Sequence, residues 1–149
     1  MSNTIDILGD EQTAALLISR EITEFVDDTL TDIGSYAFSN CSALTSVSLP
    51  AATSIGYSAF SSCTRLTSVS LPLATSIDIK AFSNCYDLTS VILGNTEQVA
   101  TISSTNVFNG SSNAIIYVPD ALVNDYKATT NWSTYANRIK GISELPEGV

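Results

Sequence analysis

Hydrophobic and polar residues recur in a fixed pattern of 22 residues through the middle of the chain. In the segment Leu44-Thr-Ser-Val47-Ser-Leu49, apolar residues alternate with serines, and a period of two predicts a β-strand with one buried face. Pro50 then ends the segment, because proline has no N–H to donate to a neighbouring strand. The register predicts parallel strands at Ser46–Leu49, Ser68–Leu71 and Ser90–Leu93.

A second apolar cluster lies between these strands, and it reads Ile55-Gly56-x-x-Ala59-Phe60 in its middle copy. We expect it to turn the chain and to place the phenylalanine in the centre of each coil. One coil cannot bury such side chains alone, whereas stacked coils bury them against each other. A fixed period of this length with Leu-x-x-Leu-x-Leu spacing is typical of leucine-rich repeats.

The pattern extends beyond the three clean copies. Residues 22–27 form a degraded first strand, and Ile116-Tyr117-Val118-Pro119 restores the strand-and-proline signature. After the third clean copy the repeat becomes longer than 22 residues, so residues 94–112 carry a small insertion. We therefore predict a leucine-rich repeat solenoid of mixed β structure, with about five coils over residues 22–119 and short helical caps.

Open solenoid ends need caps, and both ends of this chain carry helical signals. Residues 1–21 are expected to form an N-terminal helical cap, with Asp10 as the N-cap of a helix over Glu11–Arg20. Residues 120–149 are expected to form a C-terminal helical cap that includes a helix over Ala121–Ala128. The chain is then one domain, residues 1–149.

The C-terminal cap also holds the only tryptophan of the sequence. Trp132, Tyr135 and Ile139 are spaced to share one helical face. We interpret Trp132 as part of the core of the cap, in preference to a role in stacking on a ligand.

Three cysteines occupy one repeat position, Cys41, Cys63 and Cys85. A zinc site needs four ligands, usually in close Cys-x-x-Cys pairs, and a disulfide would leave one thiol over. We interpret the three residues as a ladder of buried thiols, each a small apolar filler and a weak donor to neighbouring backbone.

The charge and composition exclude several classes of function. The net charge of −9 argues against nucleic acid, since phosphate contacts need a basic surface. The absence of histidine removes the commonest general base and metal ligand, and no glycine-rich phosphate loop is present. We therefore expect no enzyme, no cofactor and no metal.

Targeting signals give no positive evidence of export. The N-terminal residues lack a charged and apolar leader, and no apolar run approaches the roughly 20 residues of a membrane span. We expect cytoplasmic synthesis without membrane insertion, with association to a virion or non-classical surface exposure as further locations.

Repeat positions that differ between copies are free of packing, so they are the candidate contact surface. Tyrosine and arginine dominate binding energy at interfaces, and the variable positions include Tyr36, Tyr57, Arg65 and Tyr86. The exposed face of the predicted strands is rich in serine and carries larger groups only near its ends, among them Ile92 and Tyr117. The alternative interpretation of all six residues is a solvated convex surface.

The recurring Ile-Gly-x-x-Ala-Phe-x-x-Cys-x-x-Leu-Thr-Ser-Val-x-Leu-Pro pattern resembles the BspA-like leucine-rich repeats of bacterial surface proteins. The resemblance implies recognition or adhesion towards a protein or a surface glycan, and it implies no catalysis. Short versions without a secretion signal also resemble repeat proteins of prophage-like regions. The alternative is therefore a structural or receptor-binding subunit of a phage virion or tail-like assembly, as a homo-oligomer or part of a larger complex.

Overall fold

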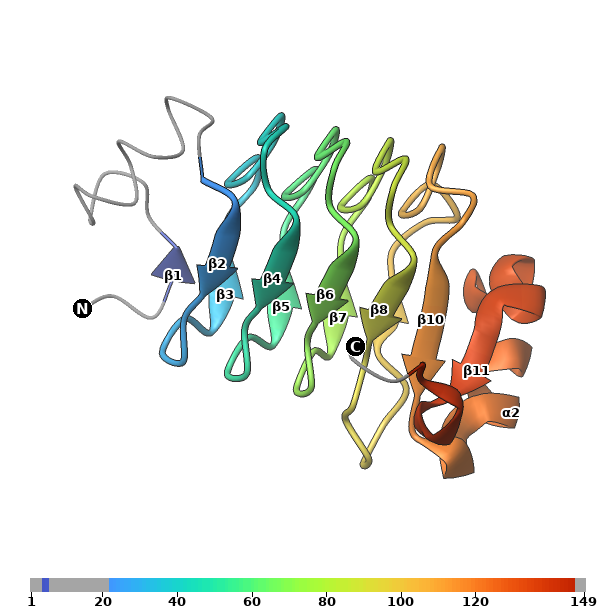
Figure 1. Cartoon of the computed structure of the whole chain (residues 1–149). Coiled ribbons are helices and arrows are strands. Elements are labelled where there is room, and N and C mark those ends of the chain that lie inside the picture. Colours follow the sequence, from blue (N-terminus) through green and yellow to red (C-terminus); the bar gives the residue numbers. More distant parts are fainter. Residues whose placement is uncertain (1–3, 6–21, 147–149) are drawn as a thin grey trace.

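Successive coils of the chain pair strand by strand into a parallel front sheet (Figure 1). The computed structural model describes residues 4–5 and 22–146. In this part of the chain the front sheet has six strands: β2 (Glu24–Val26), β4 (Ser46–Ser48), β6 (Ser68–Ser70), β8 (Ser90–Ile92), β10 (Ile115–Val118) and β11 (Ile139–Gly141). Val47 lies opposite Val69, and Val69 opposite Val91. The predicted parallel strands and the solenoid are confirmed.

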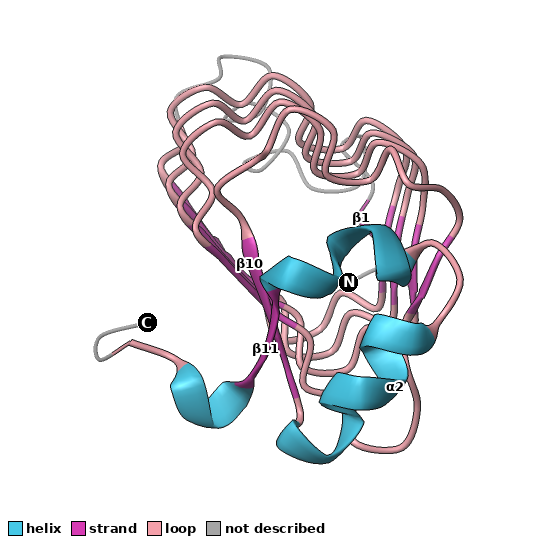
Figure 2. Ribbon diagram, turned by 90° about the vertical axis from the view of Figure 1, so that its right-hand side faces the viewer, coloured by secondary structure: helices cyan, strands magenta, loops and turns pink. Residues whose placement is uncertain are grey.

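The apolar cluster around each isoleucine forms a second, back sheet that the sequence pattern did not predict. Its five strands in the described residues are β1 (Thr4–Ile5), β3 (Asp32–Ile33), β5 (Ser54–Ile55), β7 (Ser76–Ile77) and β9 (Thr101–Ile102). The expected turn is present at residues 57–62, directly after β5 and Gly56. The strands before it were not predicted, because two-residue strands are too short to produce a visible alternation. Stacked turns close the third side of the coil (Figure 2).

A column of phenylalanine rings runs through the centre of the solenoid. Phe38, Phe60, Phe82 and Phe108 stack in sequence, with ring centroids 5.0, 5.3 and 5.7 Å apart and ring planes within 9° of parallel. All four side chains are essentially inaccessible to solvent. Stacked aromatic pairs contribute about 0.5–1.5 kcal/mol each beyond the area they bury. The predicted central position of the phenylalanines is confirmed.

The thiol ladder lies beside this column, and its burial is confirmed. The sulfur atoms of Cys63 and Cys85 each donate to the carbonyl of the phenylalanine in the preceding coil, at 3.1 Å. Ser111 takes the same place one coil further, and its hydroxyl donates to the Phe82 carbonyl at 2.5 Å. The position therefore selects a small side chain that can donate one hydrogen bond to the coil before it.

Threonine side chains reinforce the backbone pairing between coils. The hydroxyls of Thr45, Thr67 and Thr89 donate to the carbonyl of the threonine 22 residues earlier, at 2.9, 3.0 and 3.1 Å. Thr53, Thr75 and Thr101 make the equivalent bonds beside the back sheet. Each coil is thus joined to the previous one by side-chain as well as main-chain hydrogen bonds.

Helical segments lie across the open C-terminal end of the coils (Figure 2). They are η1 (Asp120–Leu122), α2 (Val123–Ala128) and η2 (Trp132–Arg138), whereas η3 (Ile142–Glu144) follows β11 and lies outside the coils on the side of the front sheet. Trp132 is fully buried, as expected for the core of a cap. Ile139 was expected on the helical face of Trp132, but it begins β11, which pairs with β10. That expectation was wrong because the edge of β10 offers backbone groups that a strand satisfies better than a helix.

Polar atoms of the cap satisfy the exposed backbone of the last coil. The Trp132 indole N–H donates to the Ala100 carbonyl at 2.6 Å, and the Tyr126 hydroxyl accepts from the Ala100 N–H at 2.9 Å. Asn131 donates to the Ile102 carbonyl, and Arg138 to the Ser111 carbonyl. Buried backbone groups cost free energy unless they are paired, so these side chains replace the missing next coil.

At the other end, β1 adds one strand to the back sheet beside β3, with Thr4 opposite Asp32. The predicted N-terminal helix, Glu11–Arg20 with its N-cap Asp10, lies outside the described residues.

Replacement of Trp132 tests the cap. Trp132→Ala removes both the ring packed near Phe108 and the bond to Ala100, so we expect a loss of about 3–5 kcal/mol in the free energy of unfolding. Trp132→Phe keeps an aromatic ring and loses the indole donor, with an expected cost of about 1–3 kcal/mol. Urea denaturation followed by circular dichroism measures both. Equal stability of all three proteins would contradict the assigned role.

The burial of the three cysteines predicts that their thiols react slowly with a thiol reagent. Burial raises the pKa of the Cys85 thiol to about 12, although hydrogen bonds from the Cys63 backbone and the Ser111 hydroxyl act to lower it. Since the thiolate is the reactive form and all three side chains are buried, we expect a thiol reagent at pH 8 to label Cys41, Cys63 and Cys85 only on unfolding. Labelling is followed by mass spectrometry with and without urea. Complete reaction within minutes in native buffer is the opposing result.

Candidate functional site

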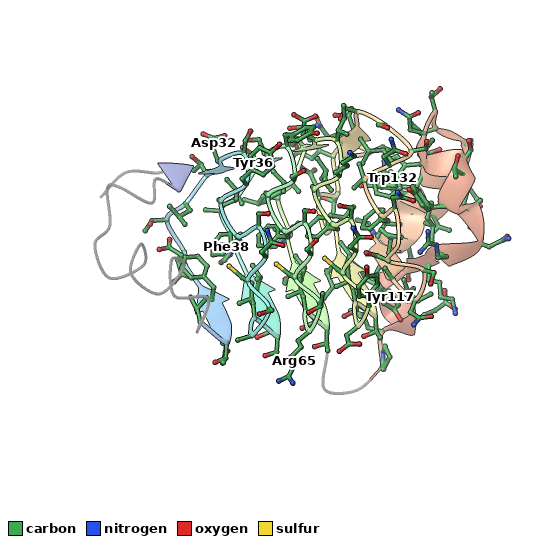
Figure 3. The ribbon with its side chains drawn as sticks, turned by 90° about the horizontal axis from the view of Figure 1, so that it is seen from above. Asp32, Tyr36, Phe38, Arg65, Tyr117 and Trp132 are labelled. Carbon is green, nitrogen blue, oxygen red and sulfur yellow. The ribbon has the colours of Figure 1, made fainter. Side chains whose placement is uncertain are left out.

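The candidate residues from the sequence lie on two opposite sides of the rod. Tyr36 and Tyr57 stand at the corner where the back sheet meets the stacked turns, and Arg65 lies on the far side, towards the front sheet (Figure 3). Tyr86 occupies the turn that leads into β8, one coil beyond Arg65. The structure therefore brings the two pairs into separate surfaces and does not gather them into one site.

The outer face of the front sheet does not carry all of the large exposed side chains that the sequence suggested near its ends. Tyr117 was expected to be exposed, but it is only 5% accessible, because β11 pairs with β10 and places Lys140 beside Tyr117 opposite Ile92. Ile92 is half-buried, whereas Val26 at the other end is 59% exposed. Tyr117 is thus a packing residue of the last coil, and its predicted exposure was wrong.

Tyr36, which is exposed, and Tyr57, which is half-buried, form an aromatic pair. Their ring centroids are 5.4 Å apart, with an edge-to-face angle of 63°. Tyr36 is 58% accessible, and its N–H donates to the Tyr57 carbonyl at 2.9 Å. Partial loss of solvent and the neighbouring Tyr57 raise the pKa of Tyr36, so its phenol stays protonated at neutral pH. The pair offers a fixed ring surface with a neutral hydroxyl donor.

The backbone at Tyr36 has an unusual conformation for a bulky residue. Its φ is 61°, and the equivalent residues of the next two coils, Ser58 and Lys80, have φ of 51° and 60°. The turn therefore holds a left-handed residue in these three coils, a conformation that glycine and asparagine adopt most easily. A tyrosine here costs backbone energy, so the turn itself gives no reason for the ring.

A shallow groove of about 440 Å³ crosses the back sheet beside this pair. Its outward-facing residues come from β5, β7 and β9 and from the positions that follow them: Ser54, Gly56, Ser76, Asp78, Thr101 and Ser103. Gly34 and Gly56 occupy the position after the isoleucine in their coils, and Asp78 and Ser103 occupy it in the next two. Of the two glycines only Gly56 lines the groove, where it leaves one end open, and the side chains of Asp78 and Ser103 form a polar wall at the other end.

Gly56 is required by close packing between coils. A Cβ at this position would lie 2.7 Å from the Ile33 carbonyl oxygen and 2.8 Å from the Ser35 nitrogen. Tyr57 follows Gly56 directly, so the aromatic pair and the groove are adjacent along the chain as well as in space.

Hydroxyl and carboxylate groups are hydrogen-bonded in pairs on this sheet. The Ser54 hydroxyl donates to Asp32 Oδ1 at 2.5 Å. Asp78 Oδ1 accepts from the Ser103 hydroxyl at 2.8 Å and from the Ile79 N–H at 2.7 Å. The result is a row of acceptors and donors held in fixed directions across neighbouring coils.

This arrangement suits non-covalent binding. Within residues 4–5 and 22–146, no three His, Cys, Asp or Glu side chains gather as a metal site requires. Nor does this part of the chain contain a helix that is both long and apolar enough to cross a membrane.

The sequence did not point to Asp32, Ser54, Asp78 or Ser103. The signal was present in Asp78, which replaces the glycine found at the same offset in earlier copies. Without the back sheet, however, that offset could not be assigned to an outward-facing position.

Comparison with known proteins gives two findings. The family model described as "BspA type Leucine rich repeat region (6 copies)" matches residues 19–128. A solved leucine-rich repeat protein from Bacteroides ovatus is similar in structure, with a TM-score of 0.52 and 22% sequence identity over 81% of this chain and 36% of that one. The chain spans about a third of that protein's length, and the likeness shows the fold alone. Comparison with curated proteins finds no match.

The left-handed turn gives a test that separates the Tyr36 ring from its backbone. Asparagine adopts positive φ readily, so Tyr36→Asn should leave the free energy of unfolding within about 1 kcal/mol of the original. Tyr36→Val places a β-branched residue there and should cost about 1–3 kcal/mol. Chemical denaturation of both variants decides the matter, and a valine variant as stable as the asparagine variant would refute the backbone argument.

Proposed function

The chain belongs to the BspA-type leucine-rich repeat family, and we propose that it is a non-enzymatic recognition module that binds a protein or a glycan on the back side of the rod. Leucine-rich repeats are generally protein-interaction modules. Solenoids suit this role because stacked coils form a stiff and extended surface. The observation that carries the choice of side is the Tyr36–Tyr57 pair, in which Tyr36 is exposed and Tyr57 directly follows a groove residue, Gly56.

Two properties of the pair favour a contact role. Tyrosine supplies a large and stiff contact area and is enriched among the residues that dominate binding energy. The ring of Tyr36 is also held in a left-handed turn that it does not favour, so the folding of the turn does not account for it. Residues in strained conformations concentrate at functional positions.

The groove lacks the groups that catalysis needs. Asp78 Oδ1 accepts hydrogen bonds from the Ser103 hydroxyl and from the Ile79 N–H, so both contacts hold the carboxylate in place. The sequence contains no histidine that could serve as a general base. These features support binding rather than turnover.

The front side supports a second role as a subunit of a larger assembly, such as a virion or tail-like structure. Val26 is 59% exposed and Tyr86 is 55% exposed on that side. Exposed apolar groups are ordinary when they stand singly, and the mass of the protein in solution tests whether copies associate through them.

Matched double variants test which side binds. The unmodified protein is applied to an array of glycans and to a panel of purified cell-surface proteins. Tyr36→Ser with Tyr57→Ser should weaken any binding at least tenfold, because it removes both rings of the back-side pair. Arg65→Ser with Tyr86→Ser serves as the control on the front side.

Both double variants should unfold within about 1–2 kcal/mol of the unmodified protein, since the changes lie at the surface. Loss of binding only in the Arg65 and Tyr86 variant would move the site to the front side. Binding that is unchanged in both variants would leave the assembly role as the better account.

A further inference from the structure

The groove across the back sheet points to a particular class of ligand. Resting on the recognition function above, we propose that it binds a short, neutral oligosaccharide that lies across β5, β7 and β9. The inference depends on which hydrogen-bonding groups face the groove, on their charge, and on the neighbouring aromatic pair.

The backbone of the back sheet is already occupied. β7 pairs with β5 on one side and with β9 on the other. At the outer edge of β9, Asn131 donates a hydrogen bond to the Ile102 carbonyl. Trp132 donates to the Ala100 carbonyl, and the Tyr126 hydroxyl accepts from the Ala100 N–H. A peptide therefore finds no free strand edge there to extend, and a ligand in the groove must be recognised by side chains.

Those side chains are of the kind that bind sugar hydroxyls. Asp78 Oδ1 is held by Ser103 and by the Ile79 N–H, and no hydrogen bond to the described residues engages its second oxygen. The Ser76 hydroxyl, in the middle of the groove, likewise has no partner among the described side chains and backbone. A fixed carboxylate accepts hydrogen bonds from adjacent hydroxyls of a sugar ring, and charge-assisted bonds of this type are strong.

The charge of the groove decides between sugars. No lysine or arginine lines it, while Asp78 lies in its wall and Asp32 is bonded to Ser54 at its far end. An acidic sugar would meet like charges without a compensating cation, whereas a neutral sugar would not. The charge of the groove therefore disfavours acidic sugars, and neutral sugars are the proposed ligand class.

The size of the groove and the aromatic residue next to it agree with a neutral oligosaccharide as the ligand. A volume of about 440 Å³ falls within the common range of about 300–1,000 Å³ for small-ligand sites. Neighbouring strands lie about 4.8 Å apart, so the three strands span roughly 10 Å, enough for a short oligosaccharide rather than one ring. Tyr57 does not line the groove but directly follows Gly56 at its open end, where an aromatic ring can pack on the apolar face of a sugar that extends beyond the groove.

The experiment titrates the full chain with neutral oligosaccharides of glucose, galactose, mannose and N-acetylglucosamine, and with oligogalacturonate as the acidic counterpart, by calorimetry. Asp78→Asn keeps the acceptor that fixes the loop and removes the charge, and it should weaken binding of the neutral sugar at least tenfold. Asp87→Asn, an exposed carboxylate of the same coil outside the groove, should change the affinity less than twofold. Ser76→Tyr, which fills the groove, should abolish binding.

Several outcomes would overturn the proposal. They are no heat with any neutral sugar, preference for oligogalacturonate, and equal affinity of the Asp78 and Asp87 variants. Binding of a protein from the panel that depends on Tyr36 and Tyr57 but not on Asp78 would also overturn it, and would leave the recognition function intact.

Discussion

The spacing between coils is the constraint on which the rest of the structure depends. Hydrogen bonds between parallel strands fix neighbouring coils about 4.8 Å apart, so each buried side chain must pack against a copy of itself. Flat rings meet this condition by stacking, as Phe38, Phe60 and Phe82 do. Small donors meet it by reaching the carbonyl of the previous coil, and this explains why Ser111 can follow Cys85 in the same column. Repetition in the sequence is the consequence of this self-packing.

The same constraint makes the end of the rod chemically different from its middle. The last coil presents both the faces of aromatic rings and backbone groups that have no next coil to pair with. An apolar helix could cover the rings, but it could not form hydrogen bonds with the backbone groups. The cap answers with aromatic side chains that carry a polar atom. Trp132 and Tyr135 pack on Phe108 while their polar atoms bond the Ala100 and Thr105 carbonyls. The cap is therefore built from residue types that the coils themselves do not use in their centre.

This difference explains what the sequence could and could not predict. The front sheet was predictable because Val47 and Leu49 alternate with serines over several positions, whereas the back sheet pairs only two residues per coil. β11 was missed because the spacing of Trp132, Tyr135 and Ile139 imitates a helix, and with it the burial of Tyr117 was missed. Variation among the repeat copies identified Tyr36 and Tyr57 as unpacked positions. It does not show on which side of the rod a side chain lies, so it could not separate these tyrosines from Arg65 on the opposite side.

Breaks in the repetition are the most informative positions once the coils are placed. The insertion before β9 lengthens the chain, yet Ile102 still pairs in register with Ile77. Ser103 consequently lies beside Asp78, where a hydroxyl can fix a carboxylate that replaces a glycine of the earlier coils. Packing alone does not require the Asp78–Ser103 pair, since the same position after the isoleucine is occupied by Gly34 and Gly56 in the earlier coils. A polar wall therefore arises where the sequence departs from its own repeat, and the departure occurs on the surface that also carries the tyrosine pair.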